Sequence, residues 1–217
     1  EDVGNFRVIP MSNQAGKSNL ISKLSEAGII IEKNDQRLDS ILSGIKEKED
    51  NGYVYDVAGA SFEIFAREML GMMPRFFSIN RYKVTMEKRF NAKGRFSIVS
   101  EAVVSLNLGS EERVSVSESL DENGQDQGPV HALSAALRKD LGPYQSFIKD
   151  IKLVDFKVRI MNGGTEAVTR VLIDSEDDLG RRWSTVGVSA NIIDASCVAL
   201  LDSINWKLLQ EKAKPEY

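Results

Sequence analysis

Two short stretches of this 217-residue sequence combine residue types at spacings that could support chemistry. The first, Gln14-Ala-Gly-Lys-Ser, ends as a phosphate-binding loop does, in front of an expected helix. A complete loop needs a glycine five positions before Gly16, where the sequence has Met11. We therefore expect only a helix start, whose amides together with Lys17 could hold a carboxylate or phosphate from another domain.

The second stretch, Gly187-Val-Ser-Ala-Asn, places a serine at an expected strand-to-helix turn, as a nucleophile elbow does. Asn191 stands where that motif has its second glycine. The one histidine available as a general base, His131, begins a different expected helix, and no oxyanion loop is visible. We therefore expect a tight turn of small residues and predict no catalytic residue in this chain.

Metal coordination has little support in the sequence. One histidine and one cysteine are too few for the usual zinc and iron sites. We expect Cys197, Trp183 and Trp206 to be packing residues, and paired acids such as Asp177-Asp178 to be solvated in hairpins. The sequence therefore predicts no metal site and no cofactor in this chain.

Composition excludes several classes of protein. The net charge is −4 and the pI about 5.3, so there is no electrostatic case for binding nucleic acid. No apolar run approaches the length of a membrane span. The single cysteine excludes an internal disulfide, and no targeting pattern opens the chain. We expect a cytoplasmic protein, or a fragment of one, without nucleic-acid or membrane partners.

A strand–strand–strand–helix unit occurs twice. Glu101-Ala-Val-Val-Ser-Leu-Asn-Leu is echoed by Glu166-Ala-Val-Thr-Arg-Val-Leu-Ile, and Gly128-Pro-Val-His-Ala-Leu by Asn191-Ile-Ile-Asp-Ala-Ser. The period of about 65 residues is longer than that of a solenoid repeat. We therefore interpret it as one duplication, with repeats at about 95–142 and 150–209.

The second repeat shows the design most clearly. Trp183, Thr185 and Gly187 lie on one face of an alternating stretch, which is typical of a strand. From Ile192 onward, apolar residues recur at three- and four-residue steps, which is typical of a helix. Asn191 stands at the change of period and can cap this helix by accepting a backbone N–H.

The region before the repeats is expected to be small and helical. Helices are expected from Ser12 or Asn13 to about residue 27, from Asp35 onward, and over about residues 60–72. Strands are expected at about 77–86, 96–106 and 151–160, with a hairpin turn at Asn162-Gly-Gly. The predicted fold class is α+β, with helical linker subdomains at 1–74 followed by a duplicated βββα domain at 75–217.

Five stretches, ordered along nearly the whole chain, resemble one known family. They are Val8-Ile-Pro-Met-Ser-Asn-Gln-Ala-Gly-Lys-Ser-Asn, Ala60-Ser-Phe-Glu, Gly128-Pro-Val-His-Ala-Leu, Leu153-Val-Asp-Phe-Lys-Val-Arg and Trp183-Ser-Thr-Val-Gly-Val-Ser-Ala-Asn-Ile-Ile-Asp-Ala-Ser. They resemble the C-terminal half of the 2-isopropylmalate, citramalate and homocitrate synthases, and look closest to the citramalate-type members.

The resemblance implies the regulatory region of an acyltransferase that condenses acetyl-CoA with a 2-oxo acid. In the family, an N-terminal TIM barrel, which this sequence lacks, holds a divalent metal with a His-x-His motif. Residues 1–74 correspond to linker subdomains that reach over the partner protomer's active site, although Ala15 stands where the family often has serine. Residues from about 75 onward correspond to a domain that forms a homodimer and binds the end-product amino acid.

The resemblance also implies an effector site near the dimer interface. The matching positions are Gly128, Pro129, Val130, His131, Leu153, Phe156, Ile160, Ala167 and Asn191. Helix N-termini could hold the carboxylate of a branched-chain amino acid, and apolar strand residues could line its side chain. Phe156 stands where many members have tyrosine, so a hydroxyl contact is lost. The sequence leaves open whether isoleucine or leucine binds, and which 2-oxo acid the parent enzyme uses.

A second hypothesis is a stand-alone module that senses small molecules or dimerises without any attached catalytic domain. The residues alone predict a duplicated α+β module with a helical arm, for binding or association, and no catalytic site. The sequence upstream of Glu1 in the same gene would discriminate, since a barrel with His-x-His would support the first hypothesis.

Overall fold

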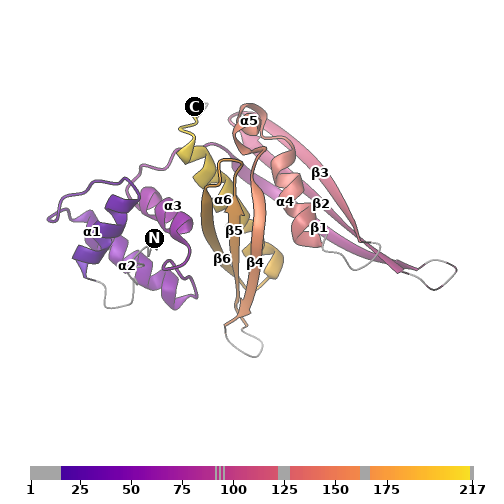
Figure 1. Ribbon diagram of the computed structural model, residues 1–217, viewed down its shortest axis with the longest axis horizontal. Coiled ribbons are helices and arrows are strands. Elements are labelled where there is room, and N and C mark those ends of the chain that lie inside the picture. Colours follow the sequence, from indigo (N-terminus) through magenta and orange to yellow (C-terminus); the bar gives the residue numbers. More distant parts are fainter. Residues whose placement is uncertain are drawn as a thin grey trace, which may run out of the picture.

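The structure is a computed structural model that describes residues 16–90, 92, 94, 96–121, 128–161 and 167–215. Its described part has three portions: a helical module and two βββα units (Figure 1). Each unit holds one antiparallel three-stranded sheet and one long helix, so the predicted α+β class and the predicted duplication are both confirmed.

The helical module contains α1 (Lys17–Glu26), α2 (Arg37–Asp50) and α3 (Gly59–Met69). Apolar residues at helical spacing form a small core between these helices and the loop that precedes α3. The main fully buried members of this core are Leu20, Leu24, Leu38, Ile41, Ile45, Tyr55 and Phe62. The helix predicted from Asp35 onward is therefore confirmed as α2, whose buried face carries Leu38, Ile41 and Ile45.

The ends of these helices differ from the sequence prediction. Gly16 is the N-cap of α1, so a cap at Ser12 or Asn13 is wrong; both residues lie outside the described part of the chain. Helix α3 ends at Met69 and not at residue 72, because the chain turns at Gly71, where φ is +66°. Glycine adopts this φ without the clash that a Cβ causes in most other residues.

The first unit contains β1 (Ser78–Phe90), β2 (Phe96–Leu108), β3 (Glu111–Asp121) and α4 (Pro129–Lys139). Its strands lie in the order β1-β2-β3. Alternate residues of β2, Ala102, Val104 and Leu106, are fully buried against α4. The unit includes β1, so the repeat boundary expected near residue 95 falls at the start of its second strand. The short helices η1 (Gly142–Tyr144) and α5 (Gln145–Ile148) lead to the second unit.

The second unit contains β4 (Lys152–Ile160), β5 (Thr169–Glu176), β6 (Arg182–Ser189) and α6 (Ile192–Gln210). The alternation predicted for β6 is confirmed, since Trp183 and Thr185 are buried against α6. Gly187 lies so close to α6 that a Cβ would overlap the carbonyl oxygen of Ala195. The hairpin turn expected at residues 162–164 lies outside the described residues.

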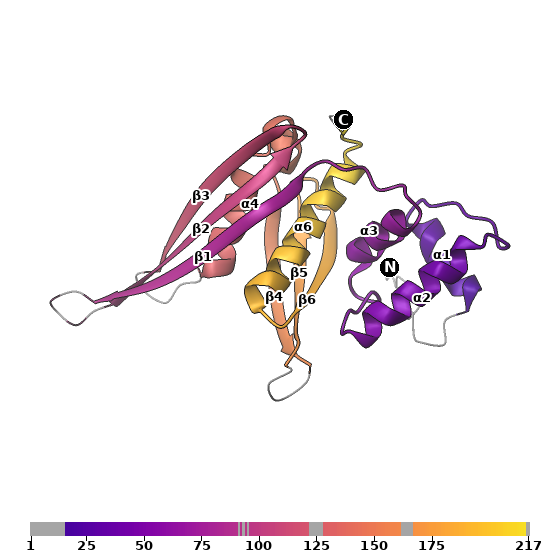
Figure 2. The same cartoon turned by 180° about the vertical axis from the view of Figure 1, so that it is seen from behind.

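The two units share one hydrophobic core, in which α4 and α6 contact each other. We call the face of each sheet that its own helix covers the inner face, and the opposite face the outer face. In Figure 1, α4 lies in front of β1–β3 whereas α6 lies behind β4–β6, and Figure 2 shows the reverse. The sheets therefore turn their inner faces in opposite directions.

The helical module packs along β6 and contacts the second unit on two sides. Leu172, Val186 and Val188, on the outer face of that sheet, pack into the module's core. On the other side, the Ser61 hydroxyl of α3 donates to a carboxylate oxygen of Asp202 in α6 at 2.6 Å and accepts from the Val186 amide at 2.9 Å. The chain itself thus covers the part of the outer face formed by Leu172, Val186 and Val188, whereas Lys157 of β4 on the same face is 63% exposed.

Candidate functional site

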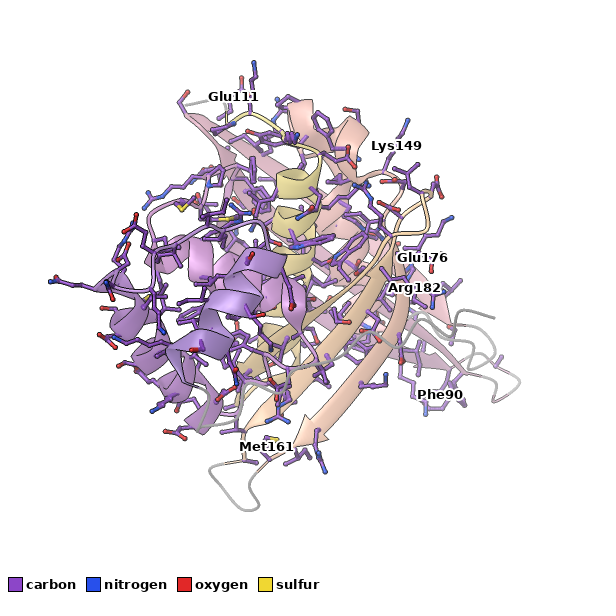
Figure 3. The ribbon with its side chains drawn as sticks, turned by 60° about the vertical axis from the view of Figure 1, so that its left-hand side comes forward. Phe90, Glu111, Lys149, Met161, Glu176 and Arg182 are labelled. Carbon is purple, nitrogen blue, oxygen red and sulfur yellow. The ribbon has the colours of Figure 1, made fainter. Side chains whose placement is uncertain are left out.

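The predicted site residues gather mainly at one end of the molecule. The N-termini of α4 and α6 lie at the same end in Figure 1, together with the last residues of β4. Figure 3 shows Phe90 and Met161 toward this end of the molecule, opposite Glu111 and Lys149. In each unit the helix follows the third strand, so α4 begins where β3 ends and α6 begins where β6 ends.

The N-terminus of α4 keeps an amide that a ligand could use. Gly128 is its N-cap, in an extended conformation, and no side chain of the described residues caps the helix. The carbonyl of Gly128 accepts from the amides of His131 and Ala132, and Pro129 has no N–H. Within the described part of the chain, the Val130 amide has no recorded acceptor. This terminus can therefore offer a donor and a favourable dipole to a carboxylate.

The N-terminus of α6 is already capped. The predicted cap is confirmed: Asn191 Oδ1 accepts from the amides of Ile193 at 2.8 Å and Asp194 at 3.4 Å. These are the donors that a bound carboxylate would use. The two helix starts, which looked equivalent in the sequence, therefore differ, and α4 is the better candidate for binding an anion.

The expected apolar wall lies on the inner face of β4. Leu153, Phe156 and Ile160 pair with Ser175, Ile173 and Thr169 of β5 in the antiparallel register. Phe156 packs against the shared core, whereas Leu153 is 39% exposed and Ile160 67% exposed. Helix α6 covers β5 and β6 and leaves this edge strand open.

This wall is longer than one amino acid. Leu153 and Ile160 are separated by roughly 23 Å at about 3.3 Å per residue. Ile160 lies toward the helix N-termini, near Ala167, because the next residue, Met161, donates its amide to the carbonyl of Val168 at 2.8 Å. Leu153 lies at the other end of the strand. A single small ligand in one protomer could therefore contact only part of the predicted set.

Sequence reasoning missed two serines beneath α4. Ser100 of β2 is fully buried, and its hydroxyl has no hydrogen-bond partner among the described residues. Its cross-strand neighbour Ser119 donates a hydrogen bond to the carbonyl of Gly128 at 3.4 Å. The regular alternation of serines along β3 was visible in the sequence, but only the fold places them under the start of α4.

A tyrosine links the first unit to the start of α6. The Tyr82 hydroxyl of β1 donates to Asp194 in the first turn of α6 at 2.7 Å. Burial, followed by this hydrogen bond to a carboxylate, raises the pKa of Tyr82, so the hydroxyl stays protonated. The bond fixes the spacing of the two units at the end where the predicted site residues gather.

The alternatives considered from the sequence gain no support. The Ser189 hydroxyl accepts from the Asn191 amide at 3.2 Å, and no contact with His131 is recorded. Lys17 pairs with Asp39 at 2.8 Å. Trp183 and Trp206 stack with ring centroids 5.1 Å apart, and Cys197 is buried, as expected for packing residues. Among the described residues, no cluster of His, Cys, Asp or Glu could hold a metal ion, and no helix could span a membrane.

The fold defines a class: an α+β domain built from a duplicated βββα unit, in which the edge strands β1 and β4 carry mostly exposed residues. The chain belongs to the family described as the LeuA allosteric (dimerisation) domain, which matches residues 56–208. The match begins before α3, so it includes the last helix of the helical module.

Several full-length relatives support this assignment. The chain is 40% identical over 214 residues to (R)-citramalate synthase from Aquifex aeolicus, covering 98% of this chain and 38% of the relative. It is 40% identical over 210 residues to (R)-citramalate synthase from Geobacter sulfurreducens, covering 96% and 38%. Against 2-isopropylmalate synthase from Methanocaldococcus jannaschii the identity is 28% over 216 residues, covering 99% and 38%. The chain thus spans little more than a third of the length of these relatives, and it resembles the citramalate synthases more than this 2-isopropylmalate synthase.

Proposed function

We propose that this chain is the allosteric regulatory and dimerisation region of an acetyl-CoA-dependent 2-oxo acid acyltransferase of the citramalate synthase type. It binds a branched-chain amino acid, isoleucine or leucine, as a feedback inhibitor. The observation that carries the proposal is the uncapped N-terminus of α4 at the same end as the open apolar face of β4. The parent's TIM barrel holds the divalent metal, and this chain needs no cofactor.

The effector's two ends have different requirements. Its carboxylate needs hydrogen-bond donors, which the Val130 amide and the helix dipole of α4 supply. Its branched side chain needs an apolar surface, which Phe156 and Ile160 supply. The buried hydroxyl of Ser100 adds a polar group near the start of α4. Because Leu153 and Ile160 lie at opposite ends of β4, Leu153 belongs to a separate contact, either a second pocket or the dimer contact.

The homodimer forms next to this site. Both β1 and β4 are edge strands with mostly exposed residues, and such edges associate readily. The exposed apolar residues of β4, among them Val158 at 42% and Ile160 at 67%, give the dimer contact an apolar centre. An effector bound at the N-terminus of α4 would then contact both protomers, which couples its binding to the shape of the dimer.

The test is a calorimetric titration of this chain with isoleucine, leucine and valine. Isoleucine or leucine should bind, and Phe156→Ala should weaken the binding by about tenfold, because a lost buried contact of this kind is worth 1–3 kcal/mol. Phe147→Ala is the matched control, since Phe147 also packs partly buried against the shared core but lies on α5. Both variants must first be shown to fold by thermal melting.

Unchanged isoleucine affinity in folded Phe156→Ala would place the pocket elsewhere. If neither isoleucine nor leucine binds at millimolar concentration, the sensor proposal is wrong. A pure association module would then remain, which is the alternative that the open edge strands favour. Acetyl-CoA and a 2-oxo acid with added magnesium should give no thiol release with this chain alone, and metal-dependent turnover would contradict that part of the proposal.

A further inference from the structure

Strand β6 lies at an edge of its sheet, so it has one side without a neighbouring strand. Its odd-numbered residues exchange hydrogen bonds with β5, since the Asp177 amide donates to the carbonyl of Arg181 at 3.1 Å in the same register. The amides and carbonyls of the even-numbered residues therefore point away from β5, to the free edge. The Val186 amide follows this rule, because it donates to the Ser61 hydroxyl of α3 at 2.9 Å.

The first half of this edge has no such partner. Among the described residues, no acceptor is recorded for the amides of Arg182 and Ser184 at the free edge, and no donor for their carbonyls. Their side chains have other partners: Arg182 pairs with Glu176 of β5 at 2.5 Å (Figure 3), and the Ser184 hydroxyl donates to Asp174 at 2.5 Å. An edge with unpaired backbone donors and acceptors is a template for an added strand.

A groove lies beside this half of the edge. It has a volume of about 830 Å³ and is bounded by the end of α1, the start of α3, the start of β6 and a residue near the end of α6. Three aromatic rings, those of Phe62, Trp183 and Trp206, line it together with Arg182 and Ser184. Ligand pockets have volumes of about 300–1,000 Å³ and are mostly apolar, so this groove has the size and lining of one.

One acidic side chain of the groove lacks a counter-charge. Lys23 pairs with Asp56 at 3.2 Å, and Glu63 pairs with Arg67 at 2.7 Å. Glu26 also lines the groove and is exposed at the end of α1, but it has no recorded ion-pair partner among the described residues. The groove therefore complements a ligand that carries a positive charge close to an apolar group.

We propose that this groove binds an extended peptide segment of another protein, which adds as a strand to the free edge of β6. Arg182 and Ser184 are roughly 7 Å apart at about 3.4 Å per residue, and an extended backbone supplies a donor and an acceptor at both levels. A free amino acid reaches only one of them. An apolar side chain of the segment packs on the aromatic rings, and a lysine or arginine of the segment pairs with Glu26.

This groove is separate from the effector site proposed above. It adjoins the first residues of β6, whereas α6 begins where β6 ends, at the end of the molecule where the predicted effector residues gather. Binding of a peptide therefore does not depend on whether the chain binds an amino acid.

Peptide binding tests the proposal. Short random peptides displayed as a library are selected on the immobilised chain, and the selected peptides are synthesised with blocked termini and titrated by fluorescence polarisation. They should carry a lysine or arginine close to an apolar residue. Methylation of every second backbone nitrogen keeps all their side chains. One alternate set of methyl groups should abolish binding and the other should leave it, because only alternate amides of an added strand face β6.

Variants of the chain locate the peptide. Ser184→Pro removes the free amide and should weaken binding by about tenfold, whereas Ser184→Ala removes only the hydroxyl and should not. Glu26→Gln should weaken binding by about threefold. Glu32→Gln, the same change on another exposed acid of the helical module, should have no effect. Thermal melting checks that each variant folds, and the methylated peptides and Glu26→Gln still test the proposal if Ser184→Pro does not.

The outcomes separate this groove from the effector site. Peptide affinity that is unchanged in Phe156→Ala and in the presence of isoleucine supports a separate groove, whether or not isoleucine itself binds. The proposal is overturned if no selected peptide binds in solution, if the two sets of methyl groups act alike, or if isoleucine displaces the peptide. It is also overturned if Glu26→Gln and folded Ser184→Pro bind the peptide as their controls do.

Discussion

The two βββα units follow the same design but differ in how tightly they are enclosed. In the second unit, β5 and β6 are covered on the inner face by the 19-residue helix α6, and Leu172, Val186 and Val188 on the outer face are covered by the helical module. The first unit has the 11-residue helix α4 on its inner face and an open outer face. Residues of β5 and β6 that are packed on both sides have little freedom to adjust, so this part of the second unit tolerates fewer changes.

The difference indicates a division of tasks between the units. Fixed groups concentrate in the second unit: a buried ionic network at the end of α6, a glycine pressed against that helix and the contacts to the helical module. Within its described residues, the first unit has a helix start without a side-chain cap, a buried serine without a hydrogen-bond partner and an apolar outer face. The four predictions below compare matched sites in the two units or between the second unit and the exposed surface, from the largest expected effect to the smallest.

Asp177→Asn should cause the largest loss of stability, about 3 kcal/mol. The expectation that Asp177 is solvated is wrong: its carboxylate is fully buried beside the Lys207 ammonium at 2.8 Å, and Lys207 itself is 2% exposed. Burial alone would raise the pKa of Asp177, but hydrogen bonds from Lys207 and Arg181 outweigh it and lower the pKa to about 2. The stabilisation is therefore present above pH 4 and lost as the pH falls toward 2.

The matched change in the first unit is Asp140→Asn. Asp140 follows α4, pairs with Arg113 at 2.9 Å and accepts the Gly142 amide, but its side chain is 48% exposed. Its loss should cost less than about 1 kcal/mol, as is usual for exposed pairs. Urea unfolding at pH 7 and pH 3 measures both variants. Equal losses at pH 7 would show that the two units are enclosed to the same degree.

Gly187→Ala should be the next largest effect, also near 3 kcal/mol but without pH dependence. The added methyl group would overlap the backbone of α6 at Ala195, which a side-chain movement cannot relieve. Gly128→Ala is the control in the first unit, because a Cβ there meets nothing within 4 Å and φ is −84°. Its effect on stability should stay below about 1 kcal/mol. Thermal melting that ranks Gly128→Ala as the worse variant would contradict the difference in packing.

Asp202→Asn should stabilise the chain relative to wild type, and this gain should be about 1–2 kcal/mol larger at pH 8 than at pH 5. Burial raises the pKa of Asp202 to about 7, although the hydrogen bond from Ser61 lowers it in part. Below pH 4 the carboxyl group of Asp202 is protonated in both the folded and the unfolded chain, so it does not reduce the free energy of unfolding. Between pH 4 and about pH 7 the unfolded chain releases this proton more readily, so the free energy of unfolding falls, and the loss levels off above pH 7. The asparagine oxygen can still accept from Ser61, so the contact between α3 and α6 remains.

The exposed surface supplies the control for Asp202. Asp39 pairs with Lys17, but its side chain is 66% exposed. Asp39→Asn should therefore change stability equally at pH 5 and pH 8. The prediction for Asp202 fails if the stability difference between Asp202→Asn and wild type is the same at the two pH values.

Local patterns made part of this structure predictable. The alternation through Trp183, Thr185 and Gly187 and the cap at Asn191 depend on neighbours along the chain, and both are confirmed. The end of α3 was missed because the apolar pattern continues past Met69, whereas Gly71 decides where the chain turns. The positive φ of Gly71, and not the spacing of the apolar residues, therefore determines where α3 ends.

Contacts between distant residues could not be predicted from one sequence. Lys207 has the residue type of an exposed helix position, yet it is buried because Asp150 and Asp177 approach it from two loops. The hydrogen bond from Tyr82 to Asp194 joins residues 112 positions apart. The candidate site has the same character: the resemblance supplied its residues, but only the fold shows that Leu153 lies far from Ile160 and that Ser119 donates to the carbonyl of Gly128.

The smallest expected effect on stability concerns one hydroxyl in each unit. Thr185 of β6 donates to the carbonyl of Ala199 at 2.8 Å, so Thr185→Val should cost about 1 kcal/mol. Ser100 of β2 is fully buried without a partner among the described residues, so Ser100→Ala should be neutral or should stabilise by up to about 1 kcal/mol. Chemical denaturation distinguishes the two results.

If Ser100 contacts the effector, the same variant should also bind isoleucine about fivefold more weakly, since an unmade hydrogen bond costs about 1 kcal/mol. A destabilised Ser100→Ala with unchanged isoleucine affinity would show that this hydroxyl has a structural partner and would remove it from the site.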